Sequence, residues 1–296
     1  MPRPISRRDF LSRAVVAASV LATPRVRWRT VPARAPLRIA VIPSARTPDR
    51  ALGIQLGVDE ARHAATLFGG GVDVTVAAPN ESLERAAPRL LAARPAVVLG
   101  GDTRAECDHL AELAQAHASL YFNVGCDDDG LRGAQCRRAA FHVCPSAAML
   151  RQAVSETRAG GATAEAWDPA LVKFGADTLN ERFQKQFHRP MGAPSWCGWV
   201  AIKIAWEASL RARAVDGPSI GAFLETSSAQ FDGHKGRALS FRLWDHQLRQ
   251  PVYVTQARAA GAEPIEVPSS RAEEDARTSL DRLGTARAAS ICVWKT

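Results

Sequence analysis

Five residues stand where predicted strands end, and their types suit a small polar ligand. They are Ser44 after the first predicted strand, Asp102 and Thr103 after the third, and Gly125 and Asp127 after the fourth. In an open α/β sheet, ligands bind beyond the carboxyl ends of the strands, near helix N-termini that favour anions. Asp102 would repel a carboxylate at short range and instead suits an amine or a hydroxyl group. A simpler interpretation is that Asp102 and Thr103 only cap the following helix.

Other kinds of chemistry are not indicated by the sequence. It has no G-x-S-x-G, H-E-x-x-H or Walker motif, and no G-x-G-x-x-G follows a predicted strand. The acidic run at 127–130 would need acids at Gly125 and Cys136 to be an EF-hand loop, so a solvated turn is the better interpretation. The Cys107-x-His109 spacing places its two side chains on different faces of a helix and does not favour zinc. We therefore expect neither an enzyme nor a resident metal or cofactor.

Hydrophobic patterning predicts alternating strands and helices in the first part of the chain. Short apolar runs predict strands, and longer segments with apolar residues at helical spacing predict helices. The predicted strands are 37–42, 72–76, 96–99 and 120–124, and the predicted helices are 49–68, 81–93 and 103–116. Pro88 should kink the second of these helices or break it. This order predicts a doubly wound α/β fold with a parallel sheet.

The remaining elements are mostly helical. A strand is predicted at 141–143, a linker at 159–163, and helices at 145–158, 168–187, 195–213 and 218–224. Residues 237–244 and 251–256 alternate in polarity around 245–247, as the arms of a β-hairpin do. Trp196, Trp199 and Trp206 fall at helical spacing, which is more typical of a core than of a ligand cage.

The basic charge of the chain is confined to its N-terminal leader. The formal net charge is +8, and residues 1–38 contain nine arginines and one acid, so residues 39–296 are neutral overall. A neutral body argues against nucleic acid as a partner.

Residues 1–22 have the pattern of a twin-arginine export signal. Arg7 and Arg8 precede an apolar run at 14–22, which is too short to span a bilayer but long enough for a signal peptide. The alternative is a basic tail before a short buried helix. We expect export to the periplasm by the twin-arginine route, a linker at 23–36, and no membrane span after signal processing. The periplasm is oxidising, so the six cysteines can pair there.

Several later segments resemble one family of exported proteins. Residues 235–251, KGRALSFRLWDHQLRQP, are the most specific, and the others are 122–125, 131–133, 136–137, 145–149, 279–284 and 290–292. They resemble the periplasmic substrate-binding proteins of ABC transporters, of type I and branched-chain amino-acid-binding-like. The similarity is to the subfamily associated with pyrroloquinoline-quinone-dependent alcohol dehydrogenase systems. It implies two α/β lobes that close on a small ligand, with an ABC permease as partner.

The chain departs from this resemblance in the region of the second lobe. In members of the family, the core of that lobe lies between two segments, which correspond here to 145–149 and to the helix that starts near Trp167. In this chain, Met149 and Trp167 are only 18 positions apart. One βαβ unit needs about 30 residues. We therefore expect a domain over 37–258 that lacks the core of lobe 2 around 150–167, followed by a tail at 259–296.

Two functions follow from a reduced second lobe, because one lobe offers a ligand only one wall. The first is a periplasmic solute-binding component of an ABC transporter linked to alcohol oxidation, with degenerate ligand binding. The second is a non-transport accessory protein of a periplasmic quinoprotein dehydrogenase.

The resemblance also implies two residue roles. Cys136 and Cys292 lie in matching segments, and a disulfide between them would tie the tail to the lobe; the alternative is two buried thiols. Thr103 resembles the hydroxyl position that helps to hold a ligand carboxylate in amino-acid binders.

Overall fold

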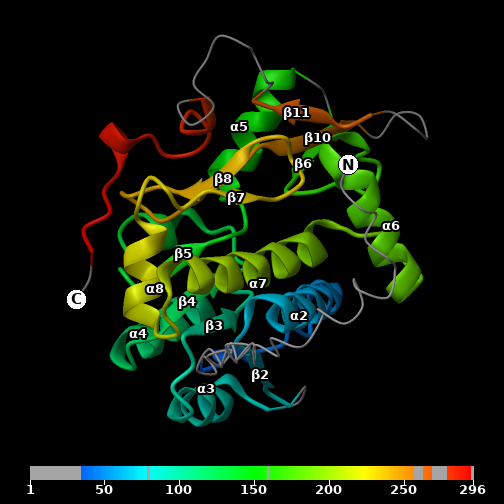
Figure 1. Cartoon of the computed structure of the whole chain (residues 1–296). Helices are drawn as coiled ribbons and strands as arrows, with labels where there is room; N and C mark the ends of the chain where they lie inside the picture. The colour runs from blue at the N-terminus through cyan, green and yellow to red at the C-terminus, as the bar shows by residue number, and fades with distance from the viewer. Residues whose placement is uncertain (1–34, 79–80, 159–160, 257–262, 269–278, 295–296) are drawn as a thin grey trace, which may run out of the picture. The chain divides into compact units, whose positions relative to one another are not determined.

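A five-stranded parallel sheet is built from the first half of the chain (Figure 1). The structure is a computed structural model that describes residues 35–78, 81–158, 161–256, 263–268 and 279–294. The strands are β1 (Leu37–Val41), β2 (Val72–Val76), β3 (Val97–Gly100), β4 (Leu120–Asn123) and β5 (Ala140–His142). Their order is β2-β1-β3-β4-β5, and each neighbouring pair is parallel. The chain therefore changes direction across the sheet between β1 and β3, which makes their carboxyl ends the topological switch point.

Helices cover both faces of this sheet, as the doubly wound prediction requires. Along β1, Ile39 packs in the apolar cluster that includes α2 (Asp49–Phe68) and α7 (Ala193–Ala212). Its neighbour Ala40 packs in the cluster that includes α3 (Leu83–Ala92) and α4 (Arg104–Ala116). Adjacent residues of a strand face opposite sides, so the two clusters are the two covered faces. The predicted α/β fold class is confirmed.

Helices α2 and α7 approach each other closely because glycine lies at their contact. A Cβ atom on Gly53 would lie 1.8 Å from the backbone oxygen of Ser195, and one on Gly198 would lie 2.6 Å from the backbone oxygen of Arg50. Ser195 Oγ also donates to Asp49 O at 2.8 Å. A side chain at these glycines would push one backbone away from the other.

The three tryptophans of α7 belong to the core, as their spacing predicts. Trp196 and Trp199 are fully buried, and Trp206 is nearly so. Trp196 stacks on Trp167 with ring centroids 5.8 Å apart.

The middle of the chain departs from the prediction in two helices. Helix α3 contains Pro88 and is not interrupted there, so of the two predicted outcomes, a kink or a break, the break does not occur. The helix predicted at 168–187 is shorter, since α6 spans Ala176–Phe187 and follows a 3₁₀ turn, η2 (Lys173–Gly175). Gly175 has φ of 79°, a left-handed conformation that stops the helix from extending toward its N-terminus.

A second, smaller sheet lies beyond β5. It consists of β6 (Ala162–Glu165), β10 (Val252–Gln256) and β11 (Ile265–Val267), in the antiparallel order β11-β10-β6. Helix α5 (Ala147–Thr157) packs against it. Ala162 and Thr163 therefore begin a strand and are not the linker that the sequence predicts, because the pairing with β10 supplies backbone partners that no local signal reveals.

The predicted C-terminal hairpin is present with a different second arm. Strand β8 (Ala238–Phe241) pairs with β9 (Leu248–Arg249) and with β7 (Phe231–Asp232), after α8 (Gly217–Leu224). Residues 252–256, expected as the returning arm, instead form β10 and pair with β6 and β11. The chain leaves the hairpin at Pro251, which has no backbone N–H to donate.

The segment 235–251 inserts buried polar side chains beside the carboxyl ends of β4 and β5. Gln250 Nε2 donates to Val143 O at 2.6 Å, and Arg132 Nε, from the 3₁₀ turn η1 (Asp129–Arg132), donates to Gln247 Oε1 at 2.7 Å. The Lys235 ammonium donates to Gln250 Oε1 and Pro251 O, both at 2.9 Å. Burial lowers the pKa of Lys235 to about 7. These contacts join the hairpin to the large sheet.

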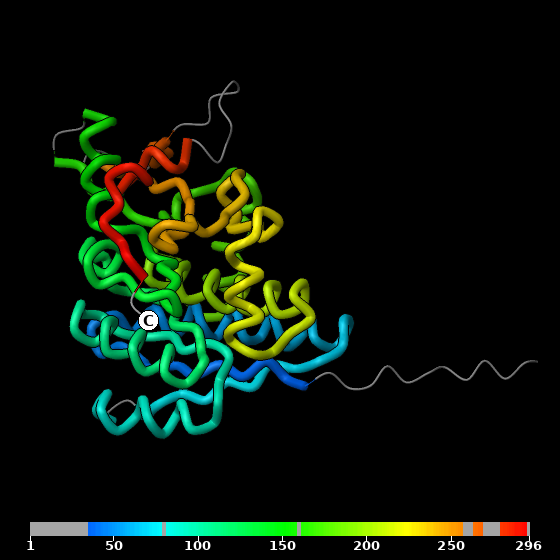
Figure 2. The backbone as a smooth tube through the Cα atoms, turned by 90° about the vertical axis from the view of Figure 1, so that its left-hand side faces the viewer, coloured from blue at the N-terminus to red at the C-terminus, as the bar shows by residue number. Residues whose placement is uncertain are grey.

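The tail returns to the large sheet after the 3₁₀ turn η3 (Arg287–Ala289). In Figure 2 it is the red segment, which descends beside the green chain. The export signal predicted at 1–22 and the linker at 23–36 fall almost wholly outside the described residues. No helix in the described part of the chain is both long and apolar enough to cross a membrane.

We predict that Gly53→Ala destabilises the protein by about 1–3 kcal/mol, because the added methyl group collides with the α7 backbone and overpacks the contact. Urea unfolding followed by circular dichroism measures this. The matched control is Gly71→Ala, where the added Cβ would find its nearest neighbour, Pro36, at 3.4 Å, and where we expect a change within about 0.5 kcal/mol. Equal stability of the two variants would contradict a tight α2–α7 contact.

Candidate functional site

A buried ion pair lies at the topological switch point of the large sheet. Arg50 Nη2, from the first turn of α2, is 2.7 Å from Asp102 Oδ1, which follows β3. The exposed fractions of the two side chains are 4% and 13%. The Ser44 hydroxyl, after β1, hydrogen-bonds the Asp102 carboxylate, and Thr47 Oγ1 donates to Asp102 Oδ1 at 3.3 Å. The loops after β1 and β3 are thus joined through one carboxylate.

The environment of Asp102 keeps this carboxylate ionised. Burial by itself would raise the pKa of Asp102. The hydrogen bond from Ser44 and the positive charge of Arg50 outweigh burial, so the pKa lies below its ordinary value. A hydrogen-bonded, paired carboxylate is the arrangement in which a buried charge is tolerated.

Gly125 completes the pocket for the arginine. A Cβ atom at Gly125 would lie 2.1 Å from Arg50 Nη2, so only glycine lets the guanidinium rest against this loop. Arg50 Nη1 also lies 3.4 Å from Gly101 O. Three of the predicted site residues, Ser44, Asp102 and Gly125, therefore surround one side chain.

The two other predicted residues have mainly structural contacts. Thr103 is the N-cap of α4: its Oγ1 accepts from Glu106 N at 3.3 Å, and Glu106 Oε2 accepts from Thr103 N at 3.0 Å. This reciprocal capping box is the simpler interpretation of Thr103, whereas Asp102 caps no helix and pairs with Arg50. Asp127 has an exposed side chain, and its carbonyl accepts from Ala147 N at 2.7 Å.

Arg50 is the functional candidate that the sequence reasoning missed. A signal for it exists, because a cation in the first turn of a helix faces the positive end of the helix dipole. Such a residue needs a compensating anion, but the sequence does not say that the anion is 52 positions away, at Asp102.

A cavity of about 370 Å³ opens beside this ion pair. Its apolar lining includes Ile42, Ile54 and Val58. The polar residues that line it are Ser44, Arg50, Gln55, Asp59 and Arg62. This volume is within the range of small-molecule sites, and a mainly apolar wall with a few polar groups is typical of them.

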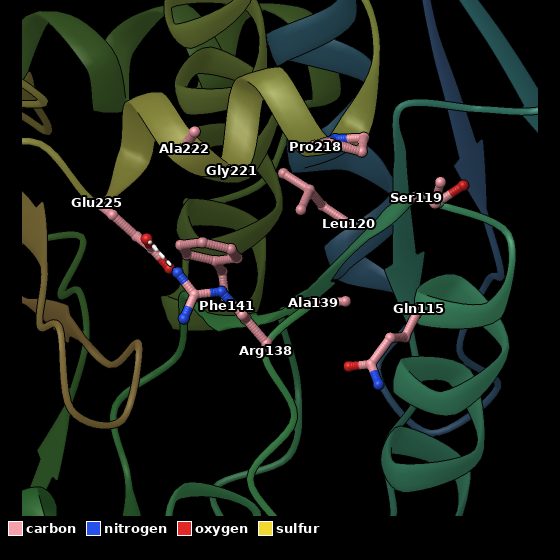
Figure 3. A pocket seen from close by; sticks show the side chains of 11 residues that line it. Gln115, Ser119, Leu120, Arg138, Ala139, Phe141, Pro218, Gly221, Ala222 and Glu225 are labelled. Carbon is pink, nitrogen blue, oxygen red and sulfur yellow. Dashed lines mark hydrogen bonds and ion pairs between the residues drawn. The ribbon is translucent and has the colours of Figure 1, made fainter. Parts of the chain in front are cut away.

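A second cavity, of about 500 Å³, lies at the opposite end of the strands (Figure 3). It is lined by Leu120, where β4 begins, by Phe141 and by residues of α8, and the Arg138–Glu225 ion pair at 2.7 Å lies beside it. Doubly wound folds bind ligands at the carboxyl ends of their strands. The cavity near Arg50 is therefore the better candidate, although it is the smaller of the two.

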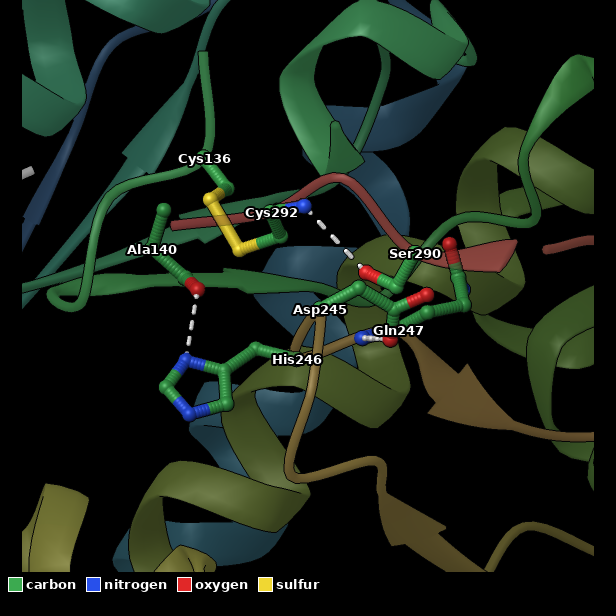
Figure 4. Close-up of a disulfide and its surroundings, with 7 residues drawn as sticks. All are labelled: Cys136, Ala140, Asp245, His246, Gln247, Ser290 and Cys292. Atoms are coloured by element: carbon green, nitrogen blue, oxygen red, sulfur yellow. Dashed lines mark hydrogen bonds between the residues drawn. A yellow bond between two sulfur atoms is a disulfide. The ribbon is translucent and has the colours of Figure 1, made fainter. Parts of the chain in front are cut away.

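A disulfide ties the tail to the chain between η1 and β5 (Figure 4). Cys136 and Cys292 are bonded, with Cα atoms 5.6 Å apart. Near this bond, His246 Nδ1 lies 3.1 Å from Ala140 O. The His246 ring stacks on Phe141 with centroids 4.1 Å apart, and the Trp294 ring lies 4.3 Å from it.

Comparison with known proteins relates this arrangement to solved structures. No protein-family profile and no curated protein matches the chain. A periplasmic binding protein from Burkholderia mallei is 10% identical, with a TM-score of 0.71, over 88% of this chain and 99% of its own. The chain has the fold of the type I periplasmic binding proteins.

Two further solved structures share this fold. A branched-chain amino acid transporter substrate-binding protein from Streptococcus pneumoniae, in complex with isoleucine, is 12% identical, with a TM-score of 0.65, over 78% of this chain and 99% of its own. A solute-binding protein of an ABC transporter from R. palustris, in complex with benzoate, is 10% identical, with a TM-score of 0.64, over 87% of this chain and 99% of its own.

We predict that Asp102→Asn costs about 3 kcal/mol of stability at pH 7, because it leaves the Arg50 charge buried without its partner. The folded pKa of Asp102 is lowered from its ordinary value of 3.8, so its contribution is complete above about pH 5 and is lost progressively as the pH falls through the folded pKa. Urea unfolding at pH 7 and at pH 3 should therefore show a difference between wild type and variant that shrinks in acid. The control is the exposed strand residue Asp73, whose change to Asn should alter stability by less than about 0.5 kcal/mol. An Asp102→Asn protein as stable as wild type at pH 7 would refute the role of the pair.

We also predict that Cys292→Ser lowers the free energy of unfolding by about 2–4 kcal/mol, because the bond closes a loop between residues 156 positions apart. Unfolding is measured without reductant, and wild type with reductant serves as the control that should reproduce the loss. Mass spectrometry of unreduced peptides should find Cys136 joined to Cys292. Alkylation of either residue in the unreduced protein would show that the bond is absent.

Proposed function

We propose that this chain is the substrate-binding component of an ABC transporter. The observation that carries the proposal is the Arg50–Asp102 pair beside a ligand-sized cavity, at the switch point of a fold shared with solved binding proteins. An ABC permease is the partner that this function requires. Export by the twin-arginine signal at 1–22, with a linker at 23–36, would bring the domain at 37–258 and the tail at 259–296 to the periplasm.

The charges of the site suggest the class of ligand. Isoleucine and benzoate, which two of the structural relatives bind, both carry a carboxylate. Arg50 lines the cavity, so its positive charge lies beside the space that a ligand would fill. A small organic acid whose carboxylate faces Arg50, and whose amine or hydroxyl faces Ser44, fits the groups that line this cavity.

The link to quinone-dependent alcohol oxidation is a finer part of this proposal. Its support is the resemblance carried by residues 235–251, whose polar side chains are buried and specifically paired. We propose on this basis that the transporter operates with a periplasmic quinoprotein dehydrogenase.

One observation favours a second function, that of an accessory protein for such a dehydrogenase. Between α5 and α6 the described residues contain only β6 and η2, and the second sheet has three short strands. This supports the proposal that the core of lobe 2 is missing around 150–167. A reduced lobe gives a small ligand less enclosure, so the face near Arg50 would then bind a protein partner.

A matched pair of substitutions tests which cavity binds a ligand. Ala51 on α2 lines the cavity near Arg50, and Ala222 on α8 lines the other; both are exposed. We predict that Ala51→Leu weakens binding about tenfold or more, which is about 1.4 kcal/mol, whereas Ala222→Leu leaves binding unchanged. The ligand is first found by a thermal-shift screen of branched-chain amino acids, benzoate, short alcohols, aldehydes and pyrroloquinoline quinone. Titration calorimetry then gives the affinities.

The screen also separates the two functions. A ligand that binds only the folded protein raises its melting temperature, and a shift abolished by Ala51→Leu supports the transport function. No shift with any compound, together with binding of the mature protein to a purified quinoprotein dehydrogenase, supports the accessory function. A shift abolished by Ala222→Leu instead would overturn the assignment of the site.

A further inference from the structure

Three of the four free cysteines among the described residues gather at the carboxyl edge of the large sheet. Cys107 lies near the start of α4, Cys126 in the loop after β4, and Cys144 in the loop after β5. All three surround Asn123, whose Oδ1 is 4.0 Å from Cys107 Sγ and 3.6 Å from Cys144 Sγ and accepts from Cys126 N at 2.9 Å. Parallel strands bring their carboxyl ends to one edge, so residues far apart in sequence meet there.

Two of these thiols interact with each other. The Cys107 and Cys126 side chains are hydrogen-bonded. The Cys144 thiol is directed instead to the backbone, since its Sγ lies 3.2 Å from Cys126 O. Within the described residues, no group of three histidines, cysteines or acids is arranged to hold a metal ion. The cluster is therefore a thiol pair with a neighbour and does not have the arrangement of a metal site.

The surrounding residues hold this pair together. Gly101 has φ of 82°, and a Cβ atom there would lie 2.8 Å from Cys107 Sγ. On the other side, Asn123 Nδ2 donates to Cys126 O at 2.7 Å, and Arg132 Nη1 donates to the same oxygen at 3.1 Å. The loop that carries Cys126 is thus fixed to β4 and η1.

The two thiols differ in pKa and in exposure. The hydrogen bond from Cys107 is the largest cause that lowers the pKa of Cys126. The Asp128 N–H and the Arg132 charge lower this pKa further, and burial raises it. The resulting pKa is about 7. The hydrogen bond and burial raise the pKa of Cys107 far above its ordinary value. Cys126 keeps 5% of its surface exposed, whereas Cys107 has none. A thiolate with some access beside a protonated thiol is the arrangement of an attacking and a resolving cysteine.

We propose that Cys107 and Cys126 form a thiol–disulfide exchange pair that reacts with small-molecule disulfides of the glutathione type. The Cys126 thiolate attacks one sulfur of the small disulfide, forming a mixed disulfide and releasing one thiolate. Cys107 then attacks Cys126 Sγ, and the small thiolate that leaves takes up the Cys107 proton, so the second small molecule departs as a thiol. Two electrons pass from the protein to the small disulfide, and one sulfur–sulfur bond is formed for each one broken.

A bond between Cys107 and Cys126 would alter the candidate ligand site. The exchange reaction does not require that this site bind a ligand. Cys107 follows Asp102 and Thr103 on the β3–α4 side, and Cys126 follows Gly125 in the loop against Arg50. Oxidation would link these two loops covalently. The exchange itself needs no ligand, so it can fail or succeed separately from the proposed transport function.

The test uses the mature full-length protein incubated with oxidised glutathione, then acid-quenched, alkylated with iodoacetamide and digested for mass spectrometry. We expect a peptide pair joined through Cys107 and Cys126, which dithiothreitol removes. In Cys107→Ser, the resolving thiol is absent, and we expect a stable glutathione adduct on Cys126. In Cys126→Ser, we expect no adduct on the buried Cys107.

The matched control is Cys197→Ser, which removes a buried free thiol on α7 and should leave the Cys107–Cys126 bond unchanged. Circular dichroism confirms that each variant is folded. Either of two results would overturn the proposal. One is a bond between Cys126 and Cys144. The other is alkylation of Cys107 and Cys126 only after unfolding, together with no glutathione adduct in Cys107→Ser.

Discussion

A buried cation that must be neutralised organises the carboxyl edge of the large sheet. Arg50 is almost wholly enclosed, and Asp102 is its ion-pair partner among the described residues. An unpaired buried charge costs several kcal/mol, so the loops after β1 and β3 must keep these two groups together. Gly125 follows from the same constraint, because a side chain there would collide with the guanidinium. Gly198 has a separate role, since it allows the backbones of α2 and α7 to approach at Arg50.

The same principle applies to the buried polar side chains of the segment 235–251. Several of its polar side chains are buried and hydrogen-bonded, as Gln247 is with Arg132 and Gln250 with Val143 O. A buried polar group without a partner is costly, so such residues cannot be exchanged singly. These contacts join the hairpin to the large sheet, so this segment has a structural role.

The large sheet and the small sheet have unequal roles. The switch point, the ion pair and both cavities lie at the large sheet. The small antiparallel sheet contains β10, which follows the hairpin, and packs against α5. The two proposed functions differ in what must face Arg50. Transport requires a wall that encloses a small ligand there, whereas the accessory function requires a face that is open to a protein partner.

Local sequence signals determined the secondary structure of the first half and much of its site. Strands β1 to β4, helices α2 and α4, and the positions of Ser44, Asp102 and Gly125 follow from periodicity and turn residues, because these act over a few residues. Tertiary structure alone decided that Arg50 faces Asp102, that residues 162–165 form a strand, and that 252–256 pair with them instead of with β8. The physical reason is that these contacts join residues dozens of positions apart, where backbone pairing and burial of charge are settled by the whole fold.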